Sequence, residues 1–468
     1  MSNTFPCTIQ CISPVDGSVY AERSATSLGD ARTVFASAAK AQKKWANLPL
    51  AERCALLHKA VDHFVSVKSD IATELAWQMG RPVSQGAGEI SGLEERARHM
   101  IDIAPQAMAQ DSLPQNGLAL RTIRREAVGT VLVIAPWNFP YLTATNAIFP
   151  ALAAGNAVVL KHSAQTLVCG ERFSEAFAAA GLPADAFQLI LTTNDDTTTL
   201  ITEGHHDHIV FTGSVGVGRS LQQADAVNFS GIDLELGGKD PAYVRADANV
   251  DFAAESLVDG AFFNSGQSCC GIERIYVHRD VYQPFVAKVV EFVNAYRLGD
   301  PTNVEVNLGP VVKTASADFV RGQINEAVTA GARALIDPAK FPADVGGTAY
   351  LAPQVLVDVT HDMRVMTEES FGPVIGIIAV DSDAQAVQLM NDSEFGLTTS
   401  IWTADIAAAE ALSERLETGT CFANRCDYLD PGLAWTGVKD TGRGCSLSSH
   451  AYTHLTRLKS YHLRAQPE

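Results

Sequence analysis

The sequence predicts an α/β protein of two or three packed units built around parallel sheets. At 468 residues the chain exceeds the size at which one core usually stops growing. From Gly129 onward, short apolar runs alternate with helix-like stretches, as in βαβ units around a parallel sheet. A hydrophobic content of 47% with 19% charged residues is typical of a globular protein.

The first part of the chain is predicted to be mostly helical. Residues 30–105 carry apolar side chains at helical spacing, with breaks expected near Pro82 and Pro105. The predicted strands that follow are 130–135, 157–160, 187–191 and 209–212, separated by helix-like residues 151–155 and 169–181. A second α/β region follows Gly238, with helix-like residues 281–296 and 315–332 and strand-like residues 275–278 and 374–380.

Two segments outside these units are predicted to be extended. Residues 118–125 follow a polar approach at 115–117, and residues 455–463 form a similar segment near the end of the chain. Extended excursions of this kind often join subunits, because they can pair with an exposed strand edge.

The composition excludes several classes of partner. The formal charge of −18 repels phosphate backbones and anionic lipid surfaces, so we expect no nucleic-acid partner and no membrane partner. Residues 1–29 lack the basic start and apolar run of an export signal. Nine cysteines without a CxxC pair or other metal-type spacing favour free thiols in a reducing cytoplasm and no bound metal.

The most informative thiol lies on a polar turn. Residues 263–274 read Phe-Asn-Ser-Gly-Gln-Ser-Cys-Cys-Gly-Ile-Glu-Arg, with Cys269 and Cys270 between helix-like and strand-like segments. A thiol on such a turn can be reached by a substrate and can act as a nucleophile. The alternative is that both cysteines fill a core, since free cysteine is among the most buried residue types.

Two upstream segments supply groups that would complete this chemistry. Glu235 lies in an apolar run, where its carboxyl group would resist ionisation and act as a general base. The alternative for Glu235 is an ion pair with Lys239. Asn138 follows a predicted strand, and its amide could donate to an oxyanion. Read alone, residues 135–140 could instead form a rigid turn.

Together these segments resemble the aldehyde dehydrogenase superfamily, of the NAD(P)-dependent, non-phosphorylating, hydrolytic type. Several distinctive motifs in family order carry the resemblance over nearly the whole chain. The motifs lie at residues 13–19, 135–140, 155–161, 211–214, 235–239, 264–274, 368–373 and 391–397.

The resemblance implies a Rossmann-type, parallel-sheet cofactor domain, an α/β catalytic domain and a β-arm for oligomerisation. The implied dinucleotide-binding domain covers residues 1–106 and 128–237, and the implied catalytic domain covers residues 238–436. Residues 107–127 and 450–468 are the implied arm and tail. A homodimer or homotetramer is then expected, because members of the family use the arm to extend a neighbour's sheet.

The resemblance also implies the reaction and the role of each site residue. Cys269 is the implied nucleophile, Glu235 the base, and Asn138 with the Cys269 backbone N–H the oxyanion hole. An aldehyde would be oxidised to its carboxylic acid through a thiohemiacetal and a thioester on Cys269. NAD or NADP is the implied cofactor, and Lys161 is also counted among the catalytic residues. The implied cofactor-binding residues are Trp137, Lys161, Ser163, Gly213, Ser214, Gly218, Glu369 and Phe371.

The chain departs from the family pattern at two places. After Lys161 the family usually has a glutamate that holds the ribose and repels a 2′-phosphate, whereas this chain has Ala164. We therefore expect both NAD and NADP to be used. Near the C-terminus, Cys445 and Ser446 replace an Arg–Glu pair, which leaves the rate of thioester hydrolysis open.

The sequence does not determine which aldehyde is oxidised. Aromatic and aliphatic pocket residues favour an aliphatic or aromatic aldehyde, whereas Arg425 could receive the carboxylate of a semialdehyde. The alternative for Arg425 is an ion pair with Asp427 or Asp430. The candidate pocket residues are Phe139, Ser268, Cys270, Arg425, Leu429 and Trp435.

Three other functions remain open. A CoA-acylating dehydrogenase passes the acyl group to CoA, and a phosphate-reducing relative works on an acyl phosphate in reverse. Both generally lack the carboxylate that Glu235 supplies. The third is a binding or structural homologue that has kept the fold and lost the chemistry. The joint presence of Asn138, Glu235 and Cys269 argues against it.

Overall fold

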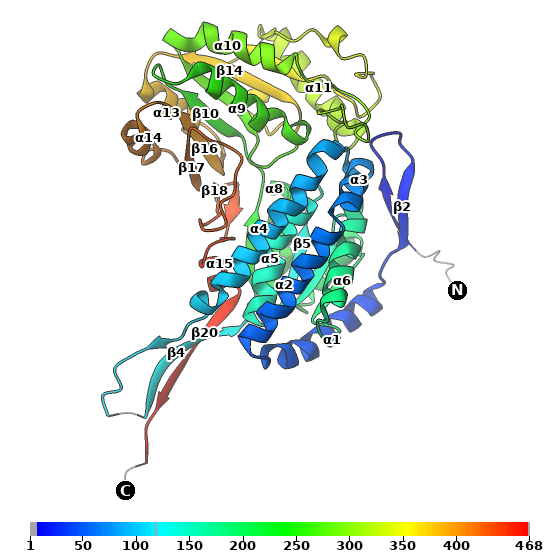
Figure 1. The fold of residues 1–468 in the computed structure, drawn as a ribbon, viewed down its shortest axis with the longest axis vertical. Helices are drawn as coiled ribbons and strands as arrows, with labels where there is room; N and C mark the ends of the chain where they lie inside the picture. The colour runs from blue at the N-terminus through cyan, green and yellow to red at the C-terminus, as the bar shows by residue number, and fades with distance from the viewer. Residues whose placement is uncertain (1–6, 118, 467–468) are drawn as a thin grey trace.

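The computed structural model describes residues 7–117 and 119–466 and has two lobes with a projecting arm (Figure 1). The outermost residues of the expected first domain and of the tail lie outside the described residues, as does Leu118 at the start of one predicted extended segment. In the described part of the chain, no helix is long and apolar enough to cross a membrane.

The predicted helical opening is confirmed as four helices. They are α1 (Leu28–Ala46), α2 (Leu50–Ser66), α3 (Lys68–Met79) and α4 (Val83–Ala107). Pro82 directly precedes α4, as the predicted break requires. The break predicted near Pro105 is wrong, because α4 continues past it to Ala107. A proline in the last turn removes one hydrogen bond near the end of the helix, which the remaining turns tolerate.

The first sheet has six strands in the order β19-β9-β8-β5-β6-β7, and all neighbours except β19 and β9 are parallel. The strands are β5 (Thr130–Ala135), β6 (Ala157–His162), β7 (Phe187–Ile190), β8 (His208–Thr212), β9 (Gly231–Glu235) and β19 (Gly442–Arg443). Between them lie α5 (Pro140–Ala154), the short 3-10 helix η1 (Ala164–Thr166), α6 (Leu167–Ala180), α7 (Asn194–Thr202) and α8 (Val215–Asp225). The carboxyl ends of β5, β8 and β9 therefore lie side by side.

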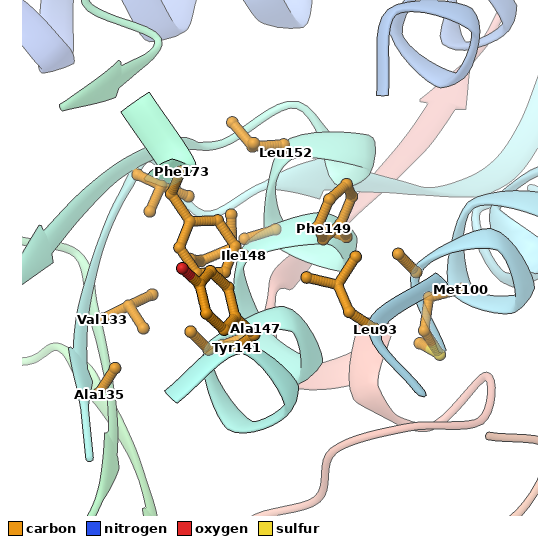
Figure 2. Packing of buried hydrophobic residues seen from close by; sticks show 14 of the residues in the cluster. Leu93, Met100, Val133, Ala135, Tyr141, Ala147, Ile148, Phe149, Leu152 and Phe173 are labelled. Carbon is orange, nitrogen blue, oxygen red and sulfur yellow. The ribbon is translucent and has the colours of Figure 1, made fainter. Parts of the chain in front are cut away.

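Helix α5 is buried between this sheet and α4 (Figure 2). In the figure, Tyr141 and Ile148 from α5 lie between Val133 on β5 and Leu93 on α4. These four side chains are at most 2% exposed. Gly92 lets the two helices approach closely, because an added Cβ would lie 2.7 Å from a methyl group of Leu142. The first core thus fixes α4 against the helix that begins directly after β5.

The second sheet has seven strands in the order β12-β13-β14-β11-β10-β16-β17, and all neighbours except β12 and β13 are parallel. The strands are β10 (Asp240–Val244), β11 (Ile272–His278), β12 (Arg333–Ala334), β13 (Gln354–Val357), β14 (Val374–Val380), β16 (Thr398–Trp402) and β17 (Thr420–Ala423). The helices of this lobe are α9 (Val250–Phe262), α10 (Arg279–Val293), α11 (Thr314–Thr329), α12 (Arg364–Thr367), α13 (Asp383–Asn391) and α14 (Ile406–Ser413). The loop that carries Cys269 connects α9 to β11.

The two segments predicted to be extended pair with each other. Strand β20 (Thr456–Leu463) runs antiparallel to β4 (Leu120–Ala127) over eight residue pairs, and β3 (Asp111–Ser112) pairs with the other edge of β4. Together they form the arm that points away from both lobes (Figure 1).

Short elements complete the described chain. A hairpin of β1 (Thr8–Ile12) and β2 (Val19–Ser24) lies along the side of the molecule (Figure 1). The short strands β15 (Phe395–Gly396) and β18 (Val438–Lys439) pair with each other. The 3-10 helices η2 (Phe263–Gly266) and η3 (Pro338–Lys340) and the short helix α15 (Ala451–His454) lie in connecting segments.

Candidate active site

A cavity of about 520 Å³ opens where β5, β8 and β9 end, next to the loop that carries Cys269. This is the edge at which ligands bind in open α/β sheets. Most of the predicted site residues line this cavity. They are Trp137, Asn138, Phe139, Gly213, Ser214, Glu235, Ser268, Cys269, Cys270, Glu369, Phe371, Leu429 and Trp435.

A strained turn presents Cys269. Asn264, Ser265 and Gly266 all have positive φ angles, of 53°, 57° and 73°. The side-chain amide of Asn264 donates to the carbonyl oxygens of Asn138 and Gln267, both at 3.1 Å. Gly266 is required, because a Cβ there would lie 2.3 Å from the Gly372 carbonyl oxygen. Backbone strain of this kind persists only where the surroundings enforce it, and it is concentrated at functional sites.

The two sulfur atoms at positions 269 and 270 differ in exposure and in electrostatics. Cys269 is partly exposed toward the cavity, whereas Cys270 is 5% exposed. Interaction with the Cys270 thiol, followed by burial, raises the pKa of Cys269 well above its usual value, and the carboxylate of Glu235 adds to the increase. The protein alone therefore keeps Cys269 as a thiol, and a nearby base is required to activate it.

The carboxyl group of Glu235 lines the same cavity as Cys269. Burial raises the pKa of its carboxyl group, while hydrogen bonds from the hydroxyls of Ser446 and Thr212 act in the opposite direction. The alternative ion pair with Lys239 is wrong, because the Lys239 ammonium pairs with Glu273. Glu235 therefore remains available at the cavity wall.

Asn138 and the backbone of Cys269 provide donors to one region of the cavity. The Asn138 side chain is 6% exposed, and its amide nitrogen makes only a long hydrogen bond of 3.3 Å to the Gln267 carbonyl. The backbone N–H of Cys269 has no acceptor in the described part of the chain. Two such donors could stabilise an oxyanion formed at the thiol.

A buried network holds the Asn138 loop in place. The Arg81 guanidinium donates at 2.5 Å to the Asn138 carbonyl oxygen and lies 4.5 Å from the centre of the Phe139 ring. It also pairs with Glu89, whose carboxylate accepts hydrogen bonds from the backbone N–H groups of Tyr141 and Leu142 at 3.0 Å each. A carboxylate at a helix N-terminus is favoured by the unpaired N–H groups and the helix dipole.

Another part of the cavity wall has features of a dinucleotide site. Gly213 and Ser214 join β8 to α8, and the Ser214 side chain leaves the first N–H groups of this helix uncapped. Gly216 lies in the first turn, and no atom lies within 4 Å of the position that a Cβ would take there, so the backbone is open to a ligand. Glycine-rich helix N-termini after a strand suit phosphate groups.

Glu369 and Phe371 line the same cavity as Gly213 and Ser214. The Glu369 carboxylate accepts a hydrogen bond of 2.9 Å from the Gly238 backbone, and burial with the nearby Glu273 charge raises its pKa to about 8. The Phe371 ring packs edge-on against Trp137, with ring centres 5.6 Å apart. These aromatic and polar groups converge on one part of the cavity.

Three predicted cofactor residues do not line the cavity itself. Lys161 lies near the end of β6, and its ammonium donates at 3.2 Å to the side-chain oxygen of Asn194. Ser163 caps the short helix η1. Gly218 is buried in α8, where a Cβ would lie 2.7 Å from the Leu236 side chain. These positions follow β6 and β8 and could contact only a ligand that extends beyond the cavity.

The predicted substrate wall is largely apolar. Phe139 stacks on Phe263 with ring centres 6.4 Å apart, and Trp435 is 4% exposed. Arg425 is a correction to the sequence-based expectation. Its guanidinium lies 3.6 Å from the centre of the Tyr428 ring and lines an adjoining surface depression, so it is not part of the cavity wall.

The expected ion pair of Arg425 is also not observed. Within residues 7–117 and 119–466, no salt bridge joins Arg425 to Asp427 or Asp430, and stacking on an aromatic ring takes its place. In the same residues, no group of three or more His, Cys, Asp or Glu side chains is placed to hold a metal ion.

Sequence reasoning missed several polar residues of the cavity. Arg81, Glu89 and Arg96 come from the helical opening, and Asn146 comes from the apolar helix α5. One signal was present, because Glu89 and Arg96 are seven residues apart and share the face of α4 that is otherwise buried. Charged side chains on an apolar helix face are seldom buried without a partner or a function.

Comparisons with known proteins agree with this geometry. The family model described as "Aldehyde dehydrogenase family" matches residues 2–461. An aldehyde dehydrogenase from Brucella melitensis biovar abortus 2308 has a TM-score of 0.94 and 29% identity, over 98% of this chain and 95% of that chain.

Two further solved structures are similar over the same extent. An NAD-dependent aldehyde dehydrogenase from Sinorhizobium meliloti has a TM-score of 0.93 and 30% identity, over 99% of this chain and 92% of its own. An NADP-dependent glyceraldehyde-3-phosphate dehydrogenase from Bacillus halodurans C-125, complexed with NADP, has a TM-score of 0.91 and 31% identity, over 98% and 96%. The full-length family match and these α/β relatives show that the chain is an oxidoreductase belonging to the aldehyde dehydrogenase family.

Proposed function

We propose that this chain oxidises an aldehyde to its carboxylic acid, with NAD or NADP, through a thioester on Cys269. One observation carries the proposal: Asn138 after β5, Glu235 at the end of β9 and Cys269 before β11 line one cavity. A thiol, a buried carboxylate and two unfilled N–H donors are the groups that such a reaction requires.

The first step is addition of the Cys269 sulfur to the aldehyde carbon. Because the cavity raises the pKa of this thiol, its proton must pass to a base, and the Glu235 carboxylate lines the same cavity. The new C–S bond converts the carbonyl oxygen to an oxyanion. The Asn138 amide and the Cys269 backbone N–H stabilise this charge, and collapse of the oxyanion expels a hydride to leave a thioester.

The second step is hydrolysis of the thioester. After the proton taken from Cys269 has passed to solvent, the ionised Glu235 removes a proton from water, the resulting hydroxide attacks the acyl carbon, and the carboxylic acid leaves as the Cys269 thiolate is released. Because burial raises the pKa of Glu235, this carboxyl group is a stronger base than an exposed glutamate. The availability of Glu235 favours water as the acyl acceptor over CoA.

The residues present fit a nicotinamide dinucleotide. The uncapped N-terminus of α8 suits the pyrophosphate, and Glu369 with Phe371 would hold the nicotinamide ribose and ring. Lys161 and Ser163 would contact the adenosine end. When bound, the oxidised nicotinamide supplies a hydride acceptor. Relatives named as NAD-dependent and as NADP-dependent both support a dinucleotide for this chain.

The test is absorbance at the reduced-nicotinamide band for purified protein mixed with a panel of aldehydes, each with NAD and with NADP. We expect growth of the band with at least one pair. Cys269→Ala should keep less than about 1% of this rate while still binding the cofactor, because loss of a covalent nucleophile costs orders of magnitude. Cys421→Ala, which removes an exposed thiol, is the matched control. Retained activity in Cys269→Ala would contradict the mechanism.

A further inference from the structure

Arg96 lines the same cavity as Cys269 and forms no salt bridge with any carboxylate of the described residues. It lies on α4, and the one hydrogen bond it makes within residues 7–117 and 119–466 is a long one, at 3.4 Å, to the side-chain oxygen of Asn146. Its neighbour Arg98, on the outer side of the same helix, pairs instead with Asp62 and Glu94. Among the described residues, the arginine that faces the cavity therefore lacks a salt bridge, whereas the arginine on the outer side of the helix has two.

The nearest carboxylates are already engaged. Glu89 accepts from Arg81 and from two backbone N–H groups of α5, and Glu235 accepts from Ser446 and Thr212. Burial lowers the pKa of Arg96, but a guanidinium remains protonated throughout the physiological range. The charges of Glu89 and Glu235 act on Arg96 without a direct contact. A partly buried guanidinium that makes no salt bridge gains more when a ligand supplies an acceptor in direct contact.

Asn146 provides a second unfilled donor beside Arg96. Its side chain is 3% exposed and lines the cavity, and its amide nitrogen has no hydrogen-bond partner among the described residues. The orientation of this amide follows from its neighbour, because Arg96 can only donate and must face the side-chain oxygen. The amide nitrogen is thereby left without an acceptor.

We propose that Arg96 and Asn146 form a carboxylate-binding subsite, and that the substrate is an aldehyde with a carboxylate at its far end, a semialdehyde. The proposal rests on the proposed function for the aldehyde end of the substrate. A carboxylate offers several acceptor sites and matches a guanidinium with an adjacent amide donor. Arg96 thus takes the role that the sequence suggested for Arg425.

Acidic residues at the rim of the cavity favour a substrate of the opposite charge. Asp259 and Asp427 line its mouth, and both side chains are exposed. These carboxylates favour a cationic substrate such as an amino aldehyde, whereas the inner Arg96 favours an anionic one. Because Arg96 is more desolvated than the rim, its interaction with a ligand charge is the less screened of the two.

The first test measures binding and needs no turnover. Cys269→Ala protein is titrated calorimetrically with short aliphatic dicarboxylates of about four to six carbons, and with the monomethyl ester of each. We expect the dicarboxylate to bind roughly 10- to 100-fold more tightly than its ester, as charge-assisted hydrogen bonds allow. Adding Arg96→Met should abolish this preference, and adding Arg98→Met should preserve it.

The second test compares semialdehydes with their methyl esters as substrates. Arg96→Met should lower kcat/KM for the semialdehyde roughly 10- to 100-fold through KM, with kcat and the ester's kcat/KM little changed. Asn146→Asp, which places an internal carboxylate beside Arg96, should have the same effect without removing the arginine. Unchanged thermal unfolding of both variants excludes a general loss of structure.

The outcomes separate this subsite from the proposed reaction. Equal binding of dicarboxylate and ester to the Cys269→Ala protein, or a kinetic preference for amino aldehydes, would overturn the subsite. If no aldehyde is oxidised but Arg96→Met still removes the dicarboxylate preference, the reaction is wrong and the subsite stands.

Discussion

The pKa of the Glu235 carboxyl group reflects opposing effects, and neighbouring side chains can shift it. Burial raises the pKa of its carboxyl group, and the hydrogen bond from Ser446 lowers it. As a general base Glu235 works when ionised, so activity should fall as the pH drops through this pKa. Because the pKa is raised, this decline should lie at higher pH than for an exposed glutamate.

Ser446→Ala should move this decline further toward alkaline pH. Loss of the hydroxyl removes a hydrogen bond that favours the ionised carboxylate, so the pKa of Glu235 rises. The measurement is the pH dependence of kcat, and Ser446→Thr, which retains a hydroxyl, is the control. A profile that does not move, or moves toward acid, would show that Ser446 does not act on the base.

We expect Ala164 to allow the use of both NAD and NADP. It follows Ser163 in η1, at the position where the family usually has the ribose-binding glutamate. The kcat/KM values with NAD and NADP should differ by less than about a thousandfold, or about 4 kcal/mol. Ala164→Glu should lower kcat/KM with NADP, because a carboxylate repels the 2′-phosphate, and should leave NAD in use. A wild-type preference for NAD above that limit would contradict dual use.

At the level of elements, the buried Arg81–Glu89 pair ties α4 to the start of α5 and to the Asn138 loop. Glu89→Gln should lower the free energy of unfolding by about 3 to 5 kcal/mol, because it leaves a buried guanidinium uncompensated. It should also reduce kcat, because the same guanidinium holds the Asn138 carbonyl. Urea unfolding and steady-state kinetics measure the two effects.

Glu94→Gln on the same helix is the matched control for this pair. Glu94 is a partly exposed partner of Arg98, with a side-chain exposure of 38%. Exposed ion pairs contribute about 0 to 1 kcal/mol, so this change should leave stability and kcat almost unchanged. Equal losses in the two variants would mean that burial of the Arg81–Glu89 pair is not what matters.

At the scale of the whole molecule, we propose that the arm joins subunits into a dimer or tetramer. Strand β20 is an edge of its three-stranded sheet, and Leu458 and Leu463 on it are 66% and 50% exposed. Exposed strand edges with apolar side chains are ready to pair with another chain. In each subunit, the six-stranded sheet would belong to the cofactor-binding unit and the seven-stranded sheet to the catalytic unit.

Leu458→Asp with Leu463→Asp should convert the oligomer to a smaller species. The charges would be buried and unpaired at an interface, whereas they would remain hydrated in a separate subunit. Light scattering coupled to gel filtration measures the mass, and Lys459→Gln on the same strand is the control. A wild-type protein that elutes only as a monomer would contradict the proposal.

The sequence by itself determined most of the helices and strands and the family, and it named the candidate reactive groups. Short apolar runs predicted β5 and β14 with the bounds that the structure shows, because a parallel strand that is buried on both faces is apolar at nearly every position. The motifs around Asn138, Glu235 and Cys269 resemble those of one family in the same order, and that resemblance implied a shared site. The end of α4 beyond Pro105 escaped local rules, because packing of the whole helix outweighs one proline.

Only the tertiary structure decided which charges are paired. Arg425 looked like the candidate carboxylate receptor, yet it stacks on Tyr428 and lines an adjoining depression instead of the cavity wall. Arg96 looked like one of several charged residues on an amphipathic helix. In the described part of the chain, Asn146 on α5 lies beside it and no carboxylate forms a salt bridge with it. The partners of a charged side chain lie far away in the sequence. Burial increases the electrostatic energy of each contact, because the effective dielectric constant is lower in the interior. Site electrostatics therefore follow from packing, which local sequence patterns do not encode.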